Sequence, residues 1–139
     1  MIKGRLLQLL VVLTVSVFVA GCEGSGRTQK VYNVVDSPTT AKPGLSVADV
    51  SNAIIRGGQQ RGWVIKKVSD GQLEGTLRVR THVAVVDITH DTQTFSIKYK
   101  SSVHLLYSNE GGTEYIHRNY NSWVRFLESD IKLAVGLVR

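Results

Sequence analysis

The first 22 residues restrict what the rest of this chain can fold into. Lys3 and Arg5 form a short cationic start, and a largely apolar run follows from Leu6 to Ala20. The run is too short for an ordinary membrane-spanning helix, and it closes on small residues that fit a protease cleft. This order of features is typical of an export signal. We therefore expect residues 1–21 to be removed and the fold to form from the remainder.

The segment Val19–Cys22, which reads Val-Ala-Gly-Cys, resembles the lipobox of bacterial lipoproteins, with Val where Leu is commonest. In that family the cysteine thiol is joined to diacylglycerol, the chain is cut just before it, and the new amino terminus is acylated. The resemblance implies that Cys22 is lipidated. It is the only cysteine in the chain and has no intrachain disulfide partner. The alternatives are a secretory signal with a chance cysteine, or an uncleaved anchor.

The residue after the cysteine bears on the destination. Among lipoproteins of double-membrane bacteria, an Asp at this position commonly retains the protein in the inner membrane, and this chain has Glu23 instead. The resemblance therefore implies the outer membrane, on its periplasmic side. Because Glu is chemically close to Asp, the inner membrane stays open as an alternative.

Charge gives a weaker indication of the partner. Cleavage removes Lys3 and Arg5 and no acidic residue, so the formal net charge falls from +6 to +4. This mild basicity permits contact with anionic envelope material such as phospholipid headgroups, and it does not favour a nucleic-acid partner. Nothing after residue 22 is apolar for long enough to cross a bilayer.

Residues 22–44 read as the lipidated cysteine followed by a flexible linker. Gly, Ser and Thr are frequent here, and both prolines of the chain, Pro38 and Pro43, lie in this stretch. A coil of this length has ends roughly 25 Å apart, which is enough to hold a small domain clear of the headgroups. Val31 to Val35 interrupts the polar run and either adds an edge strand to the domain or packs on it.

Residues 45–139 are long enough for one modest core. Ser46 and Asp49 fit a capping box, which predicts a helix that ends near Gly62. Strands are then expected over residues 63–68, over 73–88 with a break or bulge near Gly75, and over 94–100. On the last of these Phe95, Ile97 and Tyr99 alternate with polar residues and should face the core.

A second helix is expected at the carboxyl end, capped by Asn119 or Asn121. Its predicted core stripe consists of Trp123, Val124, Leu127, Ile131, Ala134 and Val135. Its predicted wet face consists of Arg125, Glu128 and Lys132. The order α-β-β-β-α predicts an α+β fold, a small two-layer domain in which two helices cover one face of an antiparallel sheet. Whether residues 103–107 add a strand stays open.

The carboxyl-terminal part supports a second resemblance. With Leu105–Tyr107, Ile116–Asn121 and Trp123–Val124 as fixed points, residues 101–131 resemble part of a group of small envelope lipoproteins of Gram-negative bacteria. The resemblance implies an envelope address and a compact α+β domain. It transfers no functional site.

No residue pattern indicates catalysis. The four histidines have no spacing that would place two on one helix face, so we expect no metal site and no cofactor. There is no Gly-x-Ser-x-Gly motif, and the acidic pairs Asp87 with Asp91 and Glu110 with Glu114 fall in predicted turns. We expect a non-enzymatic role.

Two groups of residues are candidates for binding. If the strands alternate regularly, cations emerge together on the outer face of the sheet, bordered by Ala84, Val86 and Ile88. This cationic group consists of Lys66, Arg78, Arg80, Lys98 and Lys100. The other group, in the segment that enters the last helix, consists of His117, Arg118, Tyr120 and Trp123. Each group also has a purely structural interpretation, as solvated charge or as a helix entry.

The sequence thus favours a membrane-anchored, periplasm-facing lipoprotein that acts as a binding or adaptor module in the cell envelope. Its expected partners are the membrane, through the lipid, and an anionic envelope component or an envelope protein. The alternative is an envelope hydrolase that acts on cell wall or lipid.

Overall fold

The computed structural model describes residues 26–139. The predicted export signal, Cys22 and Glu23 lie outside the described residues. In chain order the elements are β1 (Thr28–Lys30), β2 (Val34–Pro38), α1 (Val47–Gln59), β3 (Val64–Ser69), β4 (Gln72–Val79), β5 (His82–His90), β6 (Thr94–Val103), β7 (Ser108–Glu110), β8 (Thr113–His117) and α2 (Arg118–Gly136).

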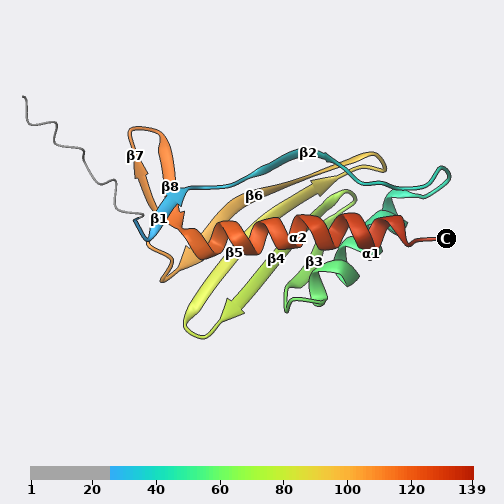
Figure 1. Ribbon diagram of the computed structural model, residues 1–139. Helices are drawn as coiled ribbons and strands as arrows, with labels where there is room; N and C mark the ends of the chain where they lie inside the picture. Colours follow the sequence, from blue (N-terminus) through green and yellow to red (C-terminus); the bar gives the residue numbers. More distant parts are fainter. Residues whose placement is uncertain (1–25) are drawn as a thin grey trace, which may run out of the picture.

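The fold is α+β, as predicted. A five-stranded antiparallel sheet with the order β2-β6-β5-β4-β3 forms one layer, and both helices cover the same face of it (Figure 1). A smaller sheet with the order β1-β8-β7 stands at the end where α2 begins. The prediction of three strands was too low, because it left a strand at residues 31–35 open and did not include the division of one predicted strand into two or the smaller sheet.

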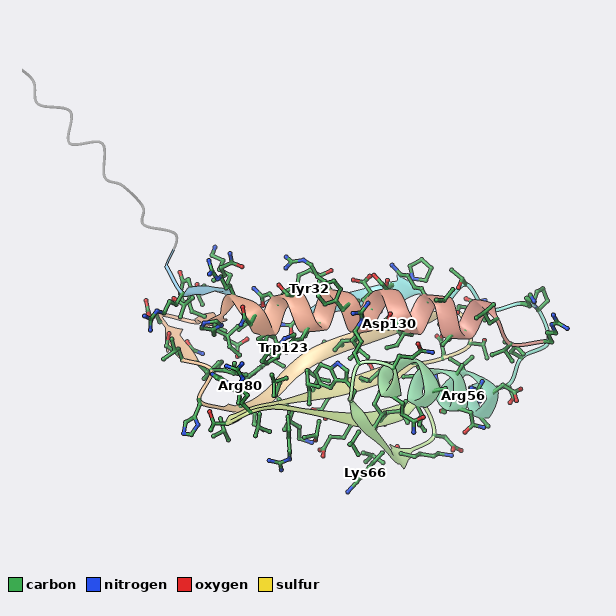
Figure 2. The ribbon with its side chains drawn as sticks, turned by 60° about the horizontal axis from the view of Figure 1, so that its bottom comes forward. Tyr32, Arg56, Lys66, Arg80, Trp123 and Asp130 are labelled. Atoms are coloured by element: carbon green, nitrogen blue, oxygen red, sulfur yellow. The ribbon has the colours of Figure 1, made fainter. Side chains whose placement is uncertain are left out.

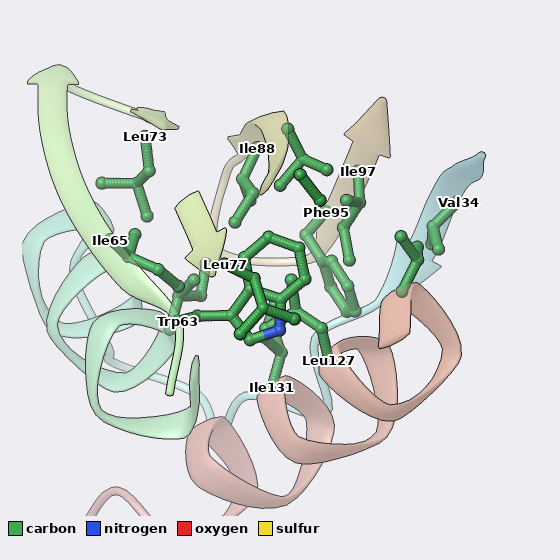
Figure 3. Close-up of a cluster of buried hydrophobic side chains, with 14 of the residues drawn as sticks. Val34, Trp63, Ile65, Leu73, Leu77, Ile88, Phe95, Ile97, Leu127 and Ile131 are labelled. Atoms are coloured by element: carbon green, nitrogen blue, oxygen red, sulfur yellow. The ribbon is translucent and has the colours of Figure 1, made fainter. Parts of the chain in front are cut away.

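The core lies between the five-stranded sheet and the two helices (Figure 3). Trp63 and Phe95 contribute the largest buried side chains on the sheet side. The predicted stripe of α2 is confirmed for Val124, Leu127, Ile131 and Val135, each of which is fully buried, whereas Trp123 and Ala134 lie half-buried at its edges.

The two helices pack closely where α1 has a glycine. A Cβ atom on Gly57 would lie 2.9 Å from the carbonyl oxygen of Asp130 and 3.0 Å from Cβ of Ala134, which is too close for either neighbour. Gly57 therefore permits the contact between α1 and α2. The predicted capping box is present, since Ser46 accepts a hydrogen bond from the backbone of Asp49 and the Asp49 side chain bonds back.

The predicted long strand over residues 73–88 is wrong. It is a hairpin in which β4 and β5 are joined at Arg80 and Thr81, and Arg80 has a φ of 55°. The sequence lacks the Gly or Asn that usually marks such a turn. Gly75 does not interrupt the strand; a Cβ atom there would crowd Val86 at 3.2 Å and Trp63 at 3.4 Å.

The hairpin also corrects which residues border the outer face. Leu77 lies opposite Ala84, and Leu73 lies opposite Ile88, so that these residues share the face covered by the helices. Ala84, Val86 and Ile88 are fully buried in the core. They do not border the outer face as predicted, because the turn at Arg80 resets the alternation that one continuous strand would have kept.

The prediction of a flexible linker over residues 22–44 is wrong from Thr28 onward. β1 pairs with β8, and β2 pairs with β6 as an edge strand of the main sheet. Val34 is buried, and so is Thr39, whose hydroxyl donates to the carbonyl oxygen of Thr92 at 2.9 Å. The open question about residues 31–35 is thereby answered, since Val34 and Val35 belong to β2.

The start of α2 differs from the prediction as well. Its N-cap is His117, whose Nδ1 accepts the backbone N–H of Asn119 at 3.2 Å. Asn121 lies inside the helix and is buried. Residues 104–107 form no strand, and both His104 and Leu106 have positive φ. Among residues 26–139 no helix is long and apolar enough to span a bilayer.

Candidate binding groove

The five predicted cations do not form one patch. Lys66 and Arg78 flank a shallow hollow on the outer face, and Figure 2 shows Lys66 pointing away from the helices. Lys98 lies opposite Asp87 in the sheet. Lys100 donates to Glu74 at 2.7 Å and to Asp87 at 3.1 Å.

The acidic neighbours change the character of this face. The hydrogen bonds to Glu74 and then to Asp87 raise the pKa of Lys100 above its ordinary value. Four of the predicted cations, Lys66, Arg78, Lys98 and Lys100, lie on the outer face, and Glu74 and Asp87 lie among them. These two carboxylates largely compensate the positive charge at the β5–β6 side. The sequence prediction counted the cations of this face and left out the carboxylates of the neighbouring strands.

The second predicted group is divided by the start of α2. Tyr120 is fully buried, and burial raises the pKa of its hydroxyl, so this residue belongs to the core. Arg118 is exposed on the other side of the helix. His117 and Trp123, by contrast, face Arg80 across a hollow of about 260 Å³ that is also lined by Val79, His82, Leu105 and Asn119. Figure 2 shows Arg80 and Trp123 near each other, toward the end of the molecule where α2 begins.

A larger hollow of about 410 Å³ adjoins the first one. It is lined by Gln60, Arg61, Trp63, Leu77, Val79, Trp123 and Phe126. The two hollows share Val79 and Trp123, and together they form a groove between α2 and the β4–β5 hairpin that ends at the last turn of α1. We call this surface the helix–hairpin groove.

Three of the seven residues that line the larger hollow are aromatic, namely Trp63, Trp123 and Phe126. Trp63 lies at its base with 1% of its surface exposed, and its indole Nε1–H has no hydrogen-bond partner among the described residues. A buried N–H without an acceptor is uncommon in a native structure. The charge of Arg61 is already engaged, because its Nε donates to Asp130 at 2.6 Å and its guanidinium lies over the ring of Phe126.

The smaller hollow supplies the polar end of the groove. Within residues 26–139 Arg80 forms no ion pair. His117 uses Nδ1 to cap α2, which leaves Nε2 as its free hydrogen-bonding atom. Arg80 and His117 together favour an anionic group here, next to the aromatic walls of the larger hollow.

None of the residues that line the helix–hairpin groove is a carboxylate, a cysteine or a hydroxyl-bearing residue. General acid–base catalysis by a carboxyl pair and nucleophilic attack by a hydroxyl therefore have no participants among these lining side chains. The arrangement is suited to binding an apolar body with an anionic end.

One contact outside the groove resembles part of a hydrolase site. The hydroxyl of Ser51 lies 2.8 Å from Nε2 of His90, and Nδ1 of His90 lies 3.0 Å from the carbonyl oxygen of Asp91. However, Ser51 is only 3% exposed on the inner side of α1, and it lines none of the hollows described above. The contact fastens α1 to β5.

The other predicted catalytic candidates are separated or engaged. Asp87 binds Lys100, and the carboxylate of Asp91 accepts the backbone N–H groups of Gln93 and Thr94 in a turn. Among residues 26–139 no three His, Cys, Asp or Glu side chains come together in a way that could hold a metal ion.

Sequence reasoning found three residues of the groove, namely Arg80, His117 and Trp123, by separate arguments. It placed Trp63 and Val79 on the sheet face toward the helices, and it made no prediction for Phe126. Trp63 and Trp123 are the only tryptophans in the chain, and both line the groove. No pattern along the chain connects them, because the fold alone brings the residue before β3 and a residue of α2 together.

Comparison with known proteins gave no match, either to a family model, to a curated protein or to a solved structure.

Proposed function

We propose that this protein is a lipoprotein of the cell envelope, anchored through Cys22 in the outer membrane on its periplasmic side, and that it binds an amphiphilic anionic envelope component in the helix–hairpin groove. The proposed role is that of a binding or adaptor module. The anchor is supported by the signal-like start of the sequence and by its lipobox resemblance.

The observation that carries the binding role is the composition of the groove. Its larger hollow is lined by Trp63, Trp123 and Phe126, and its smaller hollow by Arg80 and His117. A ligand with an apolar body and an anionic end fits both parts, because its anionic end can accept hydrogen bonds from Arg80 and His117 while its apolar body packs on the aromatic side chains. The absence of a carboxylate or hydroxyl among the lining side chains favours binding over hydrolysis.

The groove can be tested by tryptophan fluorescence, because both tryptophans line it. Lysophosphatidylglycerol is the anionic probe and lysophosphatidylcholine the zwitterionic one, both titrated below their micelle concentrations. We expect a saturable blue shift with the anionic probe. Arg80→Gln should weaken that binding about tenfold or more, the usual effect of losing a charged hydrogen bond, and change the zwitterionic titration much less.

A pair of matched variants provides the control. Val79→Glu places a carboxylate where the two hollows meet, whereas Val64→Glu makes the same change on β3 at the outer face. We expect the first variant to lose binding of the anionic probe and the second to keep it. Equal titrations of the two variants, with intact folds, would contradict the assignment of the groove.

The proposed anchor has its own test. Cys22→Ala should leave a full-length precursor that takes up no labelled fatty acid. Cleavage before residue 22 together with continued acylation in this variant would contradict the lipidation of Cys22.

The alternative function, an envelope hydrolase, is favoured by one observation, the contact between Ser51 and His90. Against it stands the burial of Ser51 on the inner side of α1. Turnover of peptidoglycan or phospholipid by the purified protein, lost in Ser51→Ala and in His90→Gln, would establish the hydrolase and overturn the binding role.

A further inference from the structure

We infer that the solvent-facing side of α2 lies on the anionic surface of the membrane that holds the anchor. This inference rests on the proposed lipidation of Cys22. It adds to the lipid a second membrane contact, formed by the folded domain, and it assigns the domain an orientation. Three independent observations lead to it.

The first observation is the shortness of the connection between the anchor and α2. The carbonyl oxygen of Arg27 accepts the backbone N–H of Arg118 at 2.9 Å, and Thr28 pairs with His117. From Cys22 to Arg27 the chain spans at most about 18 Å, whatever its conformation. A lipid on Cys22 therefore holds the first turn of α2 near the headgroups.

The second observation is a group of cations beside this connection. Arg118 and Arg125 lie seven residues apart on one line of α2, and Arg27 and Lys30 lie along the same part of the helix. The contacts that place them are the Arg27–Arg118 hydrogen bond, the bond from Asn121 to the carbonyl oxygen of Lys30, and the position of Arg125 over the Tyr32 ring. Within residues 26–139 none of these four cations forms an ion pair.

The third observation is a line of exposed apolar side chains on the same helix. Leu133 and Leu137 lie four residues apart, which places them on one stripe. Their exposed fractions are 64% and 69%. They follow the cationic line toward the carboxyl end of α2, and both groups lie on the exposed side of the helix, away from the buried Leu127 and Ile131.

A helix with a cationic line, an apolar line and a third face fixed to a protein core has the pattern of an interfacial helix. On the outer face of the sheet, by contrast, Glu74 and Asp87 lie among the cations and both bind Lys100. Charge complementarity and the short connection to the anchor therefore both point to the bilayer as the occupant of this surface.

The test uses the chain from residue 22 onward with Cys22→Ser, so that no lipid masks weaker contacts. Binding is measured by sedimentation with phosphatidylcholine vesicles that contain or lack phosphatidylglycerol. We expect binding to the anionic vesicles that falls as salt increases. The double variant Arg118→Glu with Arg125→Glu should weaken binding to the anionic vesicles at least about tenfold, since each cation near an anionic surface adds to the free energy of binding.

The matched control reverses two cations on the opposite face, Lys66→Glu with Arg78→Glu, and changes the net charge by the same amount. This control should bind nearly as well as the unsubstituted chain. Equal weakening by the two double variants, or no weakening by the α2 variant at low salt, would overturn the inference. Concentration-dependent dimers lost in Leu133→Ser with Leu137→Ser, without any change in vesicle binding, would assign the surface to a second copy instead.

A second measurement does not depend on charge reversal. Because Cys22 is the only cysteine, the Cys22→Ser chain accepts a single new cysteine for labelling. An environment-sensitive label at Leu133→Cys should shift to the blue on anionic vesicles, and one at Val64→Cys on the outer face should not. Identical responses at the two sites would contradict the orientation. Neither experiment uses the groove or fatty-acid labelling, so its failure would leave those results standing.

Discussion

The two inner sides of α2 hold the molecule together by different means. Toward the sheet the helix presents apolar side chains such as Leu127 and Ile131, which are fully buried. Toward the segment 28–38 it presents Asn121 and Glu128, which make hydrogen bonds to backbone and side-chain atoms of that segment. The first side follows a periodic pattern in the sequence, and the second has no pattern of that kind.

The polar side depends on two residues. Asn121 accepts the N–H of Tyr32 at 2.9 Å and donates to the carbonyl oxygen of Lys30 at 2.8 Å. Glu128 accepts from the hydroxyls of Tyr32 and Ser37 and from Lys132. Glu128 and Lys132 form an ion pair at 2.8 Å, but Glu128 is mostly covered and does not lie on the solvent-exposed face predicted for it. Polar contacts thus fix a segment whose composition is typical of a linker.

The comparison predicts that the apolar side contributes more to stability. Leu127→Ala should lower the free energy of unfolding by about 2–5 kcal/mol, the usual range for a truncated core leucine. Chemical denaturation followed by circular dichroism measures this change. An unchanged midpoint would show that α2 does not depend on this contact with the sheet.

The next largest effect is expected at Asn121. Replacement by Ala leaves the N–H of Tyr32 and the carbonyl of Lys30 without their partners, at about 1–3 kcal/mol. Hydrogen exchange of the Tyr32 amide should become faster in this variant. Asn119→Ala, at an exposed position in the same turn, is the matched control and should change neither quantity. Unaltered exchange at Tyr32 in Asn121→Ala would argue that other contacts fix the segment.

Glu128 gives the polar side a dependence on pH. Burial raises the pKa of its carboxyl group, but the hydrogen bonds from Lys132, Ser37 and Tyr32 together lower it more, and the net pKa lies below the ordinary 4.5. The carboxylate therefore contributes stability above about pH 4.5 that is lost as the pH falls through its pKa in the folded protein.

Replacing Glu128 by Gln should remove this contribution, about 1 kcal/mol at neutral pH, and flatten the stability profile below pH 4.5. Thermal unfolding from neutral to acidic pH measures it, with Glu110→Gln on the exposed β7–β8 hairpin as the control. A profile in Glu128→Gln that is parallel to that of the unsubstituted protein would assign the acid dependence to other groups.

The smallest effect is expected at the ion pairs of the outer face. Lys100 bonds to Glu74 and Asp87 but stays exposed to solvent, where side-chain entropy and screening offset most of the attraction. Lys100→Ala should leave the denaturation midpoint within measurement error. A clear loss of stability would show that polar contacts on this face are as important as those beside α2.

The groove could be predicted only in part. Arg80, His117 and Trp123 were candidates because cations and aromatic residues are frequent in binding sites. These three residues line one groove with Trp63, Val79 and Phe126 only because of the β4–β5 turn at Arg80 and the crossing of α1 and α2 at Gly57. Both features are set by tertiary packing, which leaves no periodic signal along the chain.

The sequence by itself determined the α+β class, the capping box of α1 and the apolar stripe of α2, because local hydrogen bonding and the period of apolar residues are written into neighbouring positions. Only the tertiary structure decided that residues 28–30 and 34–38 are strands, that residues 72–90 are a hairpin and that carboxylates lie among the cations of the outer face. Each of these depends on a partner many residues away in the chain, as when Glu128 and Asn121 fix the segment around Tyr32. Single hydrogen bonds and ion pairs of this kind need one suitable atom at the right place, and they impose no repeating pattern that a sequence could reveal.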